Sequence, residues 1–202
     1  MATTSIQSQD YHIISLSKLW KQDFYETKRA MSNFKCQEHE VEHFLHTLPE
    51  KFETNGLCRT YIFFKGSLPK ISILGYFSLS VTAITLNRGV SRLISPKLSN
   101  YYIGGYGKSR TKKAIPAYYI AQLGRDSSVP KSELPGDRFL KAIFSLIKQA
   151  QSIVGNQLVI VECKSVLLKK YYAKKANFAL LGASSLRSSS NKKTVLAYTI
   201  LK

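Results

Sequence analysis

Runs of apolar, β-branched and aromatic residues predict a protein built around a sheet. Strands are expected at 11–17, 58–64, 71–86, 117–124, 157–163, 178–184 and 193–201. Gly66, Ser67 and Pro69 separate the second run from the third, which is typical of the turn of an antiparallel hairpin.

Apolar residues at helical spacing predict three helices between these strands. The first lies between Gln37 and Leu48, and the second runs from about Pro135 to about Ile153. The third, over 165–176, is basic and amphipathic. Helices that alternate with strands in this order predict an α/β (α+β) fold, a mixed sheet with helices on both faces.

Positive charge is concentrated in two parts of the chain. The net charge is +18, and residues 87–113 and 163–202 contain seven and nine basic residues, respectively, with no acidic residue. Blocks of one sign create a directed field that attracts polyanions, so nucleic acid is the favoured partner. The block at 87–113 also carries glycines, a proline and tyrosines, and it is predicted to be an insertion outside the sheet.

Composition and length narrow the class of protein. The 202 residues are 44% hydrophobic, which suits one domain over 1–202. No apolar run approaches the roughly 20 residues that span a bilayer, and the first eleven residues do not resemble a signal peptide. Three separated cysteines without a CxxC motif indicate reduced thiols. We therefore predict a cytoplasmic protein without membrane contact.

The segment "HEVEH" matches the H-E-x-x-H pattern of zinc proteases. His39 and His43 both fall off the apolar stripe of their helix, and Pro49 ends that helix where a third ligand is wanted. We therefore interpret the two histidines as solvated surface residues and predict no metal.

Four segments in order resemble the GNAT acetyltransferases, and most closely their bacterial branch of toxins that acetylate aminoacyl-tRNA. They are "NFKCQEHEVEHFLHT", "GLCRTYIFF" with "ILGYFSLS", "QLGRD" and "LLKKYYAKKANF". The last is similar to the family pattern L-x-x-F-Y-x-x-x-G-F. The resemblance covers nearly the whole chain outside the insertion, and it implies the GNAT fold, a mixed and mostly antiparallel central sheet.

The resemblance also implies that acetyl-CoA is the cosubstrate. In the family the loop after the fourth strand wraps the pyrophosphate, and here it reads "KSELPG". Leu134 stands where the family has its first glycine. The leucine side chain is expected to crowd a phosphate at this place. Asp137 is expected to cap the following helix. The cofactor-binding residues expected on this basis are Leu123, Gly124, Arg125, Lys131, Leu134, Gly136 and Asp137.

The chemistry implied is direct transfer from the thioester to an amine. A backbone amide near 123–125 would polarise the thioester carbonyl. Tyr172 matches the tyrosine of the family's helix and would protonate the departing thiolate. The interval from Tyr172 to Phe178 is one residue longer than usual, so either Tyr172 or its neighbour Tyr171 could face the thiol. No residue matches a family position for the general base.

Three hypotheses for the function of the protein stay open, and the first two differ in the acceptor amine. The first is aminoacyl-tRNA, with the tRNA backbone on basic residues; the second is a small-molecule or protein amine. The third is a nucleic-acid-binding protein on a GNAT scaffold without catalysis. An antitoxin protein and a homodimer are further partners that the resemblance allows. The nucleic-acid-binding residues expected are Lys169, Lys170, Lys174, Lys175, Arg110 and Lys112.

Overall fold

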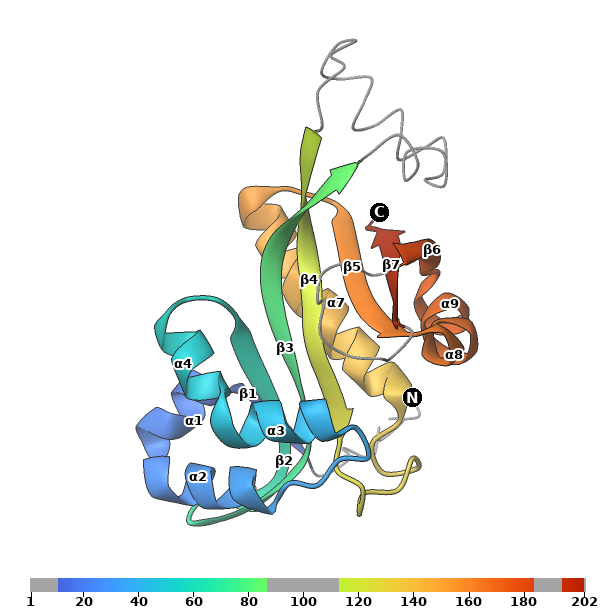
Figure 1. Ribbon diagram of the computed structural model, residues 1–202. Helices are drawn as coiled ribbons and strands as arrows, with labels where there is room; N and C mark the ends of the chain where they lie inside the picture. Colours follow the sequence, from blue (N-terminus) through green and yellow to red (C-terminus); the bar gives the residue numbers. More distant parts are fainter. Residues whose placement is uncertain (1–10, 87–112, 184–193, 202) are drawn as a thin grey trace, which may run out of the picture. The chain divides into compact units, whose positions relative to one another are not determined.

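The computed structural model describes residues 11–86, 113–183 and 194–201 (Figure 1). The predicted insertion at 87–113 therefore lies outside the described residues except for Lys113, the first residue of a strand. None of the helices in these ranges is long and apolar enough to span a bilayer.

The described residues form seven strands and a series of helices. The strands are β1 (His12–Ser15), β2 (Arg59–Ser67), β3 (Lys70–Leu86), β4 (Lys113–Arg125), β5 (Leu158–Lys164), β6 (Ala179–Ala183) and β7 (Thr194–Ile200). The helices are α1 (Leu16–Gln22), α2 (Phe24–Asn33), α3 (His39–Thr47), α4 (Pro49–Thr54), α7 (Gly136–Val154), α8 (Ser165–Leu167), the π-helical η2 (Leu168–Tyr172) and α9 (Ala173–Ala176).

The strands make one mixed sheet in the order β1-β2-β3-β4-β5-β7-β6. β2 and β3 are joined by only two residues, so they form the predicted antiparallel hairpin. β4 and β5 pair in parallel, with α7 as the crossover between them. β1 with β2, β5 with β7 and β6 with β7 pair antiparallel. The prediction of a mixed, mostly antiparallel sheet is confirmed.

Three helices, α1, α2 and α4, were not predicted from the apolar pattern. The inward face of α2 includes the polar Glu26 and Thr27 beside Ala30 and Met31, so its apolar stripe is broken. A local signal was nevertheless present, because Asp23 and Glu26 have the spacing of a helix start. The Asp23 side chain accepts a hydrogen bond from the Glu26 amide at 2.9 Å.

The chain divides into two compact units, which we describe separately. The first comprises residues up to Ser78 together with Gln122–Leu134, and the second comprises Leu79–Ala121 and the residues from Pro135 onward. In the first unit, helix residues such as Leu19 and Leu45 pack on Ile62 and Tyr76 of β2 and β3. Burying this apolar surface, at about 25 cal/mol per Å², drives the helices onto the hairpin.

The buried carboxylate of Glu26, which forms an ion pair with Arg29 of α2, also connects this helix to β3 inside the first unit. Glu26 is 8% exposed, and its carboxylate accepts two hydrogen bonds from Arg29 and one from the Ile71 amide. The hydrogen bond from Arg29, followed by that from Ile71, lowers the pKa of Glu26 to about 2. Glu26 is therefore ionised at neutral pH and holds its partners in place.

One hydrophobic cluster of the second unit lies on one face of its strands. It joins Ala117 of β4, Ile160 of β5 and Leu196 of β7 with Leu181 of β6. On β5, Leu158–Val161 are all buried. A strand buried on both faces is typical of the parallel part of a sheet that helices cover.

Candidate functional site

The strand end and loop expected to approach the thioester belong to the first unit. Asp126 directly follows β4, is 6% exposed, and accepts hydrogen bonds from the Lys35 amide at 2.7 Å and the Ser128 amide at 2.8 Å. Arg125 Nη1 donates to the Leu134 carbonyl at 3.3 Å and spans the loop. These contacts give the loop after β4 a defined path.

Gly124 is required by packing within the first unit. A Cβ added to it would lie 2.5 Å from Cγ1 of Val41 in α3 and 3.5 Å from the Tyr76 ring. No side chain fits between β4 and α3 at this point. The neighbouring Leu123 and Arg125 are partly exposed, whereas Lys131 of the loop is exposed.

Leu134, expected to offer its amide to a phosphate, is buried and already hydrogen-bonded within the loop. Its side chain is fully buried, and its amide donates to the Pro130 carbonyl at 3.3 Å. The residue that replaces the family's glycine therefore anchors the loop in the core of the first unit. Its amide already has an acceptor, which distinguishes it from the amides that follow.

In the second unit, α7 begins without a side-chain cap. Pro135 is the N-cap residue and Gly136 the first helical residue, so the expectation that Asp137 caps the helix is wrong. Proline fits this place because it has no amide hydrogen to satisfy. Asp137 instead forms an ion pair with Lys175 of α9 at 3.0 Å. The first amides of a helix have no intrahelical acceptor and carry the positive end of its dipole, so they favour an anion.

Tyr171 packs directly on the start of α7. Its hydroxyl donates to the Gly136 carbonyl at 2.5 Å. A Cβ added to Gly136 would lie 2.5 Å from Tyr171 Cε2 and 3.1 Å from the hydroxyl oxygen. Glycine is therefore the residue that allows the ring to reach the helix backbone, and this contact links two predicted motifs that are 35 residues apart.

Tyr172 points into the core of the second unit. It is 4% exposed and makes edge contacts with the rings of Tyr171 and Phe178, at centroid distances of 4.9 and 5.4 Å. Burial raises the pKa of Tyr172 far above its usual value, and nearby Cys163 and Tyr171 add to the effect. Burial likewise raises the pKa of Tyr171. Both phenols therefore keep their protons at neutral pH and can act as proton or hydrogen-bond donors.

A π-helical turn explains the extra residue before Phe178. Leu168–Tyr172 form η2, in which the Ala173 amide donates to the Leu168 carbonyl five residues earlier. Such a turn accommodates one residue more than an α-helical turn. Asn177 then ends α9 with φ 53° and ψ 33°, the left-handed conformation that a glycine usually adopts at a helix end. The π turn thus brings both Tyr171 and Tyr172 onto buried surface.

β4 and β5 pair only along part of their length. Their recorded pairs run from Tyr118 with Val159 to Ile120 with Val161. β5 continues beyond Val161 to Lys164, and β4 continues beyond Ile120 to Arg125. The backbone groups past the last pair are therefore not joined in this ladder.

The basic side chains expected to bind nucleic acid are exposed on η2 and α9. Lys169, Lys170, Lys174 and Lys175 are all exposed. Among these four, Lys175 is the one with a recorded ion pair. Arg110 and Lys112 lie outside the described residues.

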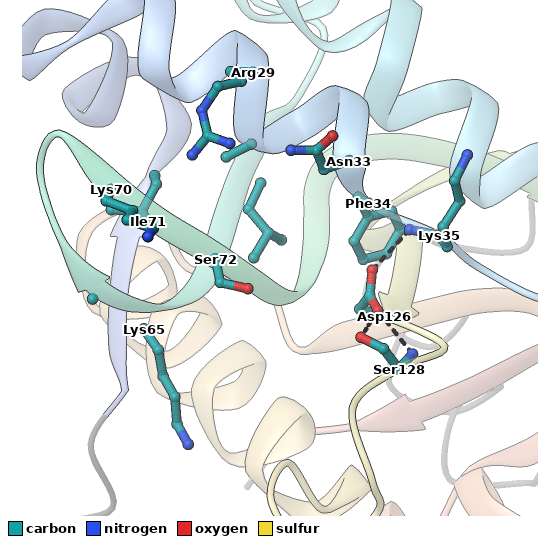
Figure 2. A pocket seen from close by; sticks show the side chains of 13 residues that line it. Arg29, Asn33, Phe34, Lys35, Lys65, Lys70, Ile71, Ser72, Asp126 and Ser128 are labelled. Atoms are coloured by element: carbon teal, nitrogen blue, oxygen red, sulfur yellow. Dashed lines mark hydrogen bonds between the residues drawn. The ribbon is translucent and has the colours of Figure 1, made fainter.

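The first unit also contains a cavity of about 590 Å³ that the sequence did not predict (Figure 2). Its lining comes from α2, from the β2–β3 hairpin, and from Asp126 and Ser128 after β4. The basic residues that line it are Arg29, Lys35, Lys65 and Lys70. The first three form ion pairs with Glu26, Glu42 and Glu133. The cavity therefore offers little uncompensated charge to an anionic ligand.

The "HEVEH" segment forms α3, and the rings of His39 and His43 stack on its exposed face, 6.1 Å apart. Within the described ranges no group of three or more His, Cys, Asp or Glu residues is placed to hold a metal ion.

Comparison with solved structures identifies the fold. No protein-family model matches the sequence, and no curated protein matches it significantly. The structure of AtaT complexed with acetyl-methionyl-tRNAfMet is similar over 95% of both chains, with a TM-score of 0.64 and 19% identity. AtaTR bound with AcCoA is similar over 93% of this chain and 92% of its own, with a TM-score of 0.62 and 19% identity. A tyrosine-to-phenylalanine mutant of KacT is similar over 95% of this chain and 96% of its own, with a TM-score of 0.65 and 18% identity. The chain therefore has the fold that its motifs predicted, the fold of the GNAT acetyltransferases.

Proposed function

We propose that this protein is an acetyl-CoA-dependent N-acetyltransferase whose acceptor is the amino group of an aminoacyl-tRNA. One observation carries the proposal. Over 95% of the chain the fold resembles that of AtaT, which was solved with an acetylated aminoacyl-tRNA, and a related AtaTR structure was solved with AcCoA. Fold alone does not imply function, so the site residues and the surface charge must supply the rest.

The first amides of α7 are the proposed pyrophosphate contacts. Gly136 and Asp137 offer these amides, and the ion pair with Lys175 offsets the negative charge of Asp137 that would otherwise repel a phosphate. Lys131 adds a positive charge on the loop. The Leu134 amide contributes less than the resemblance implied, because it already donates to Pro130.

Transfer proceeds by direct attack of the amine on the thioester. The amine nitrogen bonds to the acetyl carbon while the carbon–sulfur bond breaks. A backbone amide of Leu123–Arg125 polarises the carbonyl oxygen. Tyr172, whose phenol stays protonated at neutral pH, is the proposed donor to the sulfur as negative charge develops there.

The exposed lysines of η2 and α9 are the proposed tRNA contacts. Lys174 and Lys175 follow Tyr172 within one turn of helix, so the positive charge lies beside the proposed acid. A cationic small amine would be repelled here, whereas an aminoacyl-tRNA carries its amine on a polyanion. We further propose a cytoplasmic location, and an antitoxin partner or a homodimer as possible assemblies.

A non-catalytic nucleic-acid-binding protein on the same scaffold is the second candidate. Leu134 favours it, because a buried leucine replaces a glycine of the family's phosphate loop. Binding of acetyl-CoA by the purified protein separates the two candidates, since the non-catalytic one requires none.

The decisive experiment incubates charged tRNA with labelled acetyl-CoA and separates N-acetyl-aminoacyl-tRNA from other products. We expect label on the tRNA and binding that weakens steeply with salt, because basic contacts release counterions. Label only on free amines or protein, with tRNA affinity unchanged by salt, would exclude the tRNA acceptor.

Charge reversal locates the tRNA surface. Lys169→Glu with Lys174→Glu is expected to weaken tRNA binding and leave acetyl-CoA binding unchanged. Lys175 is avoided, because reversing it would place a second acid beside Asp137 at the start of α7. Lys18→Glu with Lys21→Glu, on exposed positions of α1, makes the same change of net charge and is the matched control. Equal losses from both pairs would show that only net charge matters.

A further inference from the structure

Glu162 occupies a distinctive place in the second unit. It is the first residue of β5 beyond Val161, where the recorded pairing with β4 ends. Its register partner on β7 is Leu196, and Lys164 pairs with Thr194. Alternation along a strand places Glu162 on the same face as Ile160, which belongs to the apolar core. Glu162 lies outside the motifs that predicted the other site residues.

The two oxygens of this carboxylate have different surroundings. Oε1 accepts a hydrogen bond from the Thr194 hydroxyl at 2.7 Å. Oε2 is buried and has no hydrogen-bond partner in the part of the chain that the structure describes. An unpaired buried carboxylate oxygen is costly, because desolvation of a charge is compensated only by a hydrogen bond or an opposite charge. The site therefore favours a hydrogen-bond donor beyond those that residues 11–86, 113–183 and 194–201 supply.

The same face offers few other titratable groups. On the second unit's strands, among residues whose side chains the structure describes, they are Lys164 on β5, Tyr119 on β4 and Tyr198 on β7. Alternation along β4 also assigns Arg125 of the first unit to this face. The described residues of β6 and of the second unit's part of β3 add no titratable group to it. Glu162 is thus the only carboxylate on this face among the described residues, and a cationic amine that reached it would meet a single acceptor.

We propose that Glu162 receives the proton of the acceptor ammonium in the transfer reaction, an inference that rests on the proposed acetyltransferase function. The ammonium donates to Oε2 and gives it one proton, which leaves a neutral amine and a protonated Glu162. The amine attacks the acetyl carbon, and the carbon–nitrogen bond forms as the carbon–sulfur bond breaks. The sulfur takes a proton from Tyr172, Tyr172 regains one from the new amide nitrogen, and Glu162 releases its proton to solvent.

The proposed base lies on β5, and the proposed acid lies on η2. Cys163 is close enough to Tyr172 to contribute to the raised pKa of that phenol. Glu162 and Cys163 are consecutive, so their side chains leave β5 on opposite faces. The proposed acid and the proposed base therefore approach β5 from opposite faces.

Glu162→Gln tests the proposal because the amide still accepts from Thr194 but does not take up a proton. We expect kcat/KM to fall about 100-fold at pH 6.5, with acetyl-CoA affinity and thermal stability close to wild type. The loss should shrink to a few-fold at pH 9, because an α-amino group with a pKa of about 8 is then already neutral. A purely structural role would give a loss independent of pH.

Controls separate the proposal from its premise. Glu50→Gln, on an exposed residue of α4, is the matched control and should keep wild-type kinetics. If Glu162→Gln folds poorly, Glu162→Ala is assayed with added formate, which should restore activity. Two outcomes with active wild-type enzyme would overturn the role of Glu162 alone. One is a loss of kcat/KM below threefold in Glu162→Gln, and the other is a loss that neither depends on pH nor is rescued by formate. Wild-type protein inactive on every charged tRNA and amine overturns both.

Discussion

Gly136→Ala probes the contact between α7 and Tyr171. The added Cβ would lie 2.5 Å from Tyr171 Cε2, closer than two carbon atoms approach, so the ring must move. Moving it disturbs the hydrogen bond to the Gly136 carbonyl, which contributes about 1 kcal/mol. Forced overpacking adds about 1–3 kcal/mol, and the better helix propensity of alanine returns up to about 1 kcal/mol. We expect a net loss of about 1–3 kcal/mol.

Thermal unfolding and calorimetry measure this effect. For a chain of this length about 1–3 kcal/mol corresponds to a fall in Tm of roughly 3–8 °C. Acetyl-CoA binding should weaken about tenfold, because the displaced ring perturbs the backbone proposed to hold the pyrophosphate, and tenfold is about 1.4 kcal/mol. The control is the Tyr171→Ala variant, which lacks the ring. In that variant, adding Gly136→Ala should cause no further loss of stability. An unchanged Tm, or an equal loss in both backgrounds, would refute the reasoning.

Three further predictions concern the acid, a buried ion pair and the histidines. Tyr172→Phe should lower turnover about 100-fold or more in single-turnover assays with cofactor affinity nearly intact, while Tyr171→Phe should do much less; the reverse ranking would exchange their roles. The pKa of Glu26 is lowered in the folded state to about 2, so its stabilisation is present above pH 4.5 and is lost as the pH falls towards 2. The Tm difference between wild type and Glu26→Gln should therefore be largest above pH 5 and shrink by pH 2.5; a constant difference would contradict this. His39→Ala and His43→Ala should leave metal content and activity unchanged by elemental analysis and assay, and stoichiometric zinc lost in either variant would reverse our interpretation.

Local patterns in the sequence predicted most of the elements. The expected strands overlap all seven strands of the structure, and the helix expected from about Pro135 to about Ile153 is α7, Gly136–Val154. The range 165–176 coincides with α8, η2 and α9 together. These segments have clear apolar periodicity, which depends only on nearby residues. The apolar pattern did not predict α2, because its buried face contains Glu26 and Thr27, whose burial depends on partners far along the chain.

The site residues were predictable only where a motif carries them. Gly136, Tyr171 and Tyr172 could be singled out from the resemblance to the family's motifs, but their mutual contacts could not. Asp137 looked like a helix cap, and its ion pair with Lys175 depends on α9 reaching the start of α7. The cavity of the first unit has no motif, because its lining comes from segments separated by up to about 100 residues.

By itself the sequence determined the alternation of strands and helices, the placement of positive charge and the motifs of a GNAT fold, since these follow from residue type and short-range spacing. The tertiary structure alone decided which tyrosine packs on Gly136 and how a π turn accommodates an extra residue. It also decided that one oxygen of Glu162 is buried with no partner among the described residues. Burial and hydrogen bonding are properties of groups brought together from distant parts of the chain, and only folding creates them.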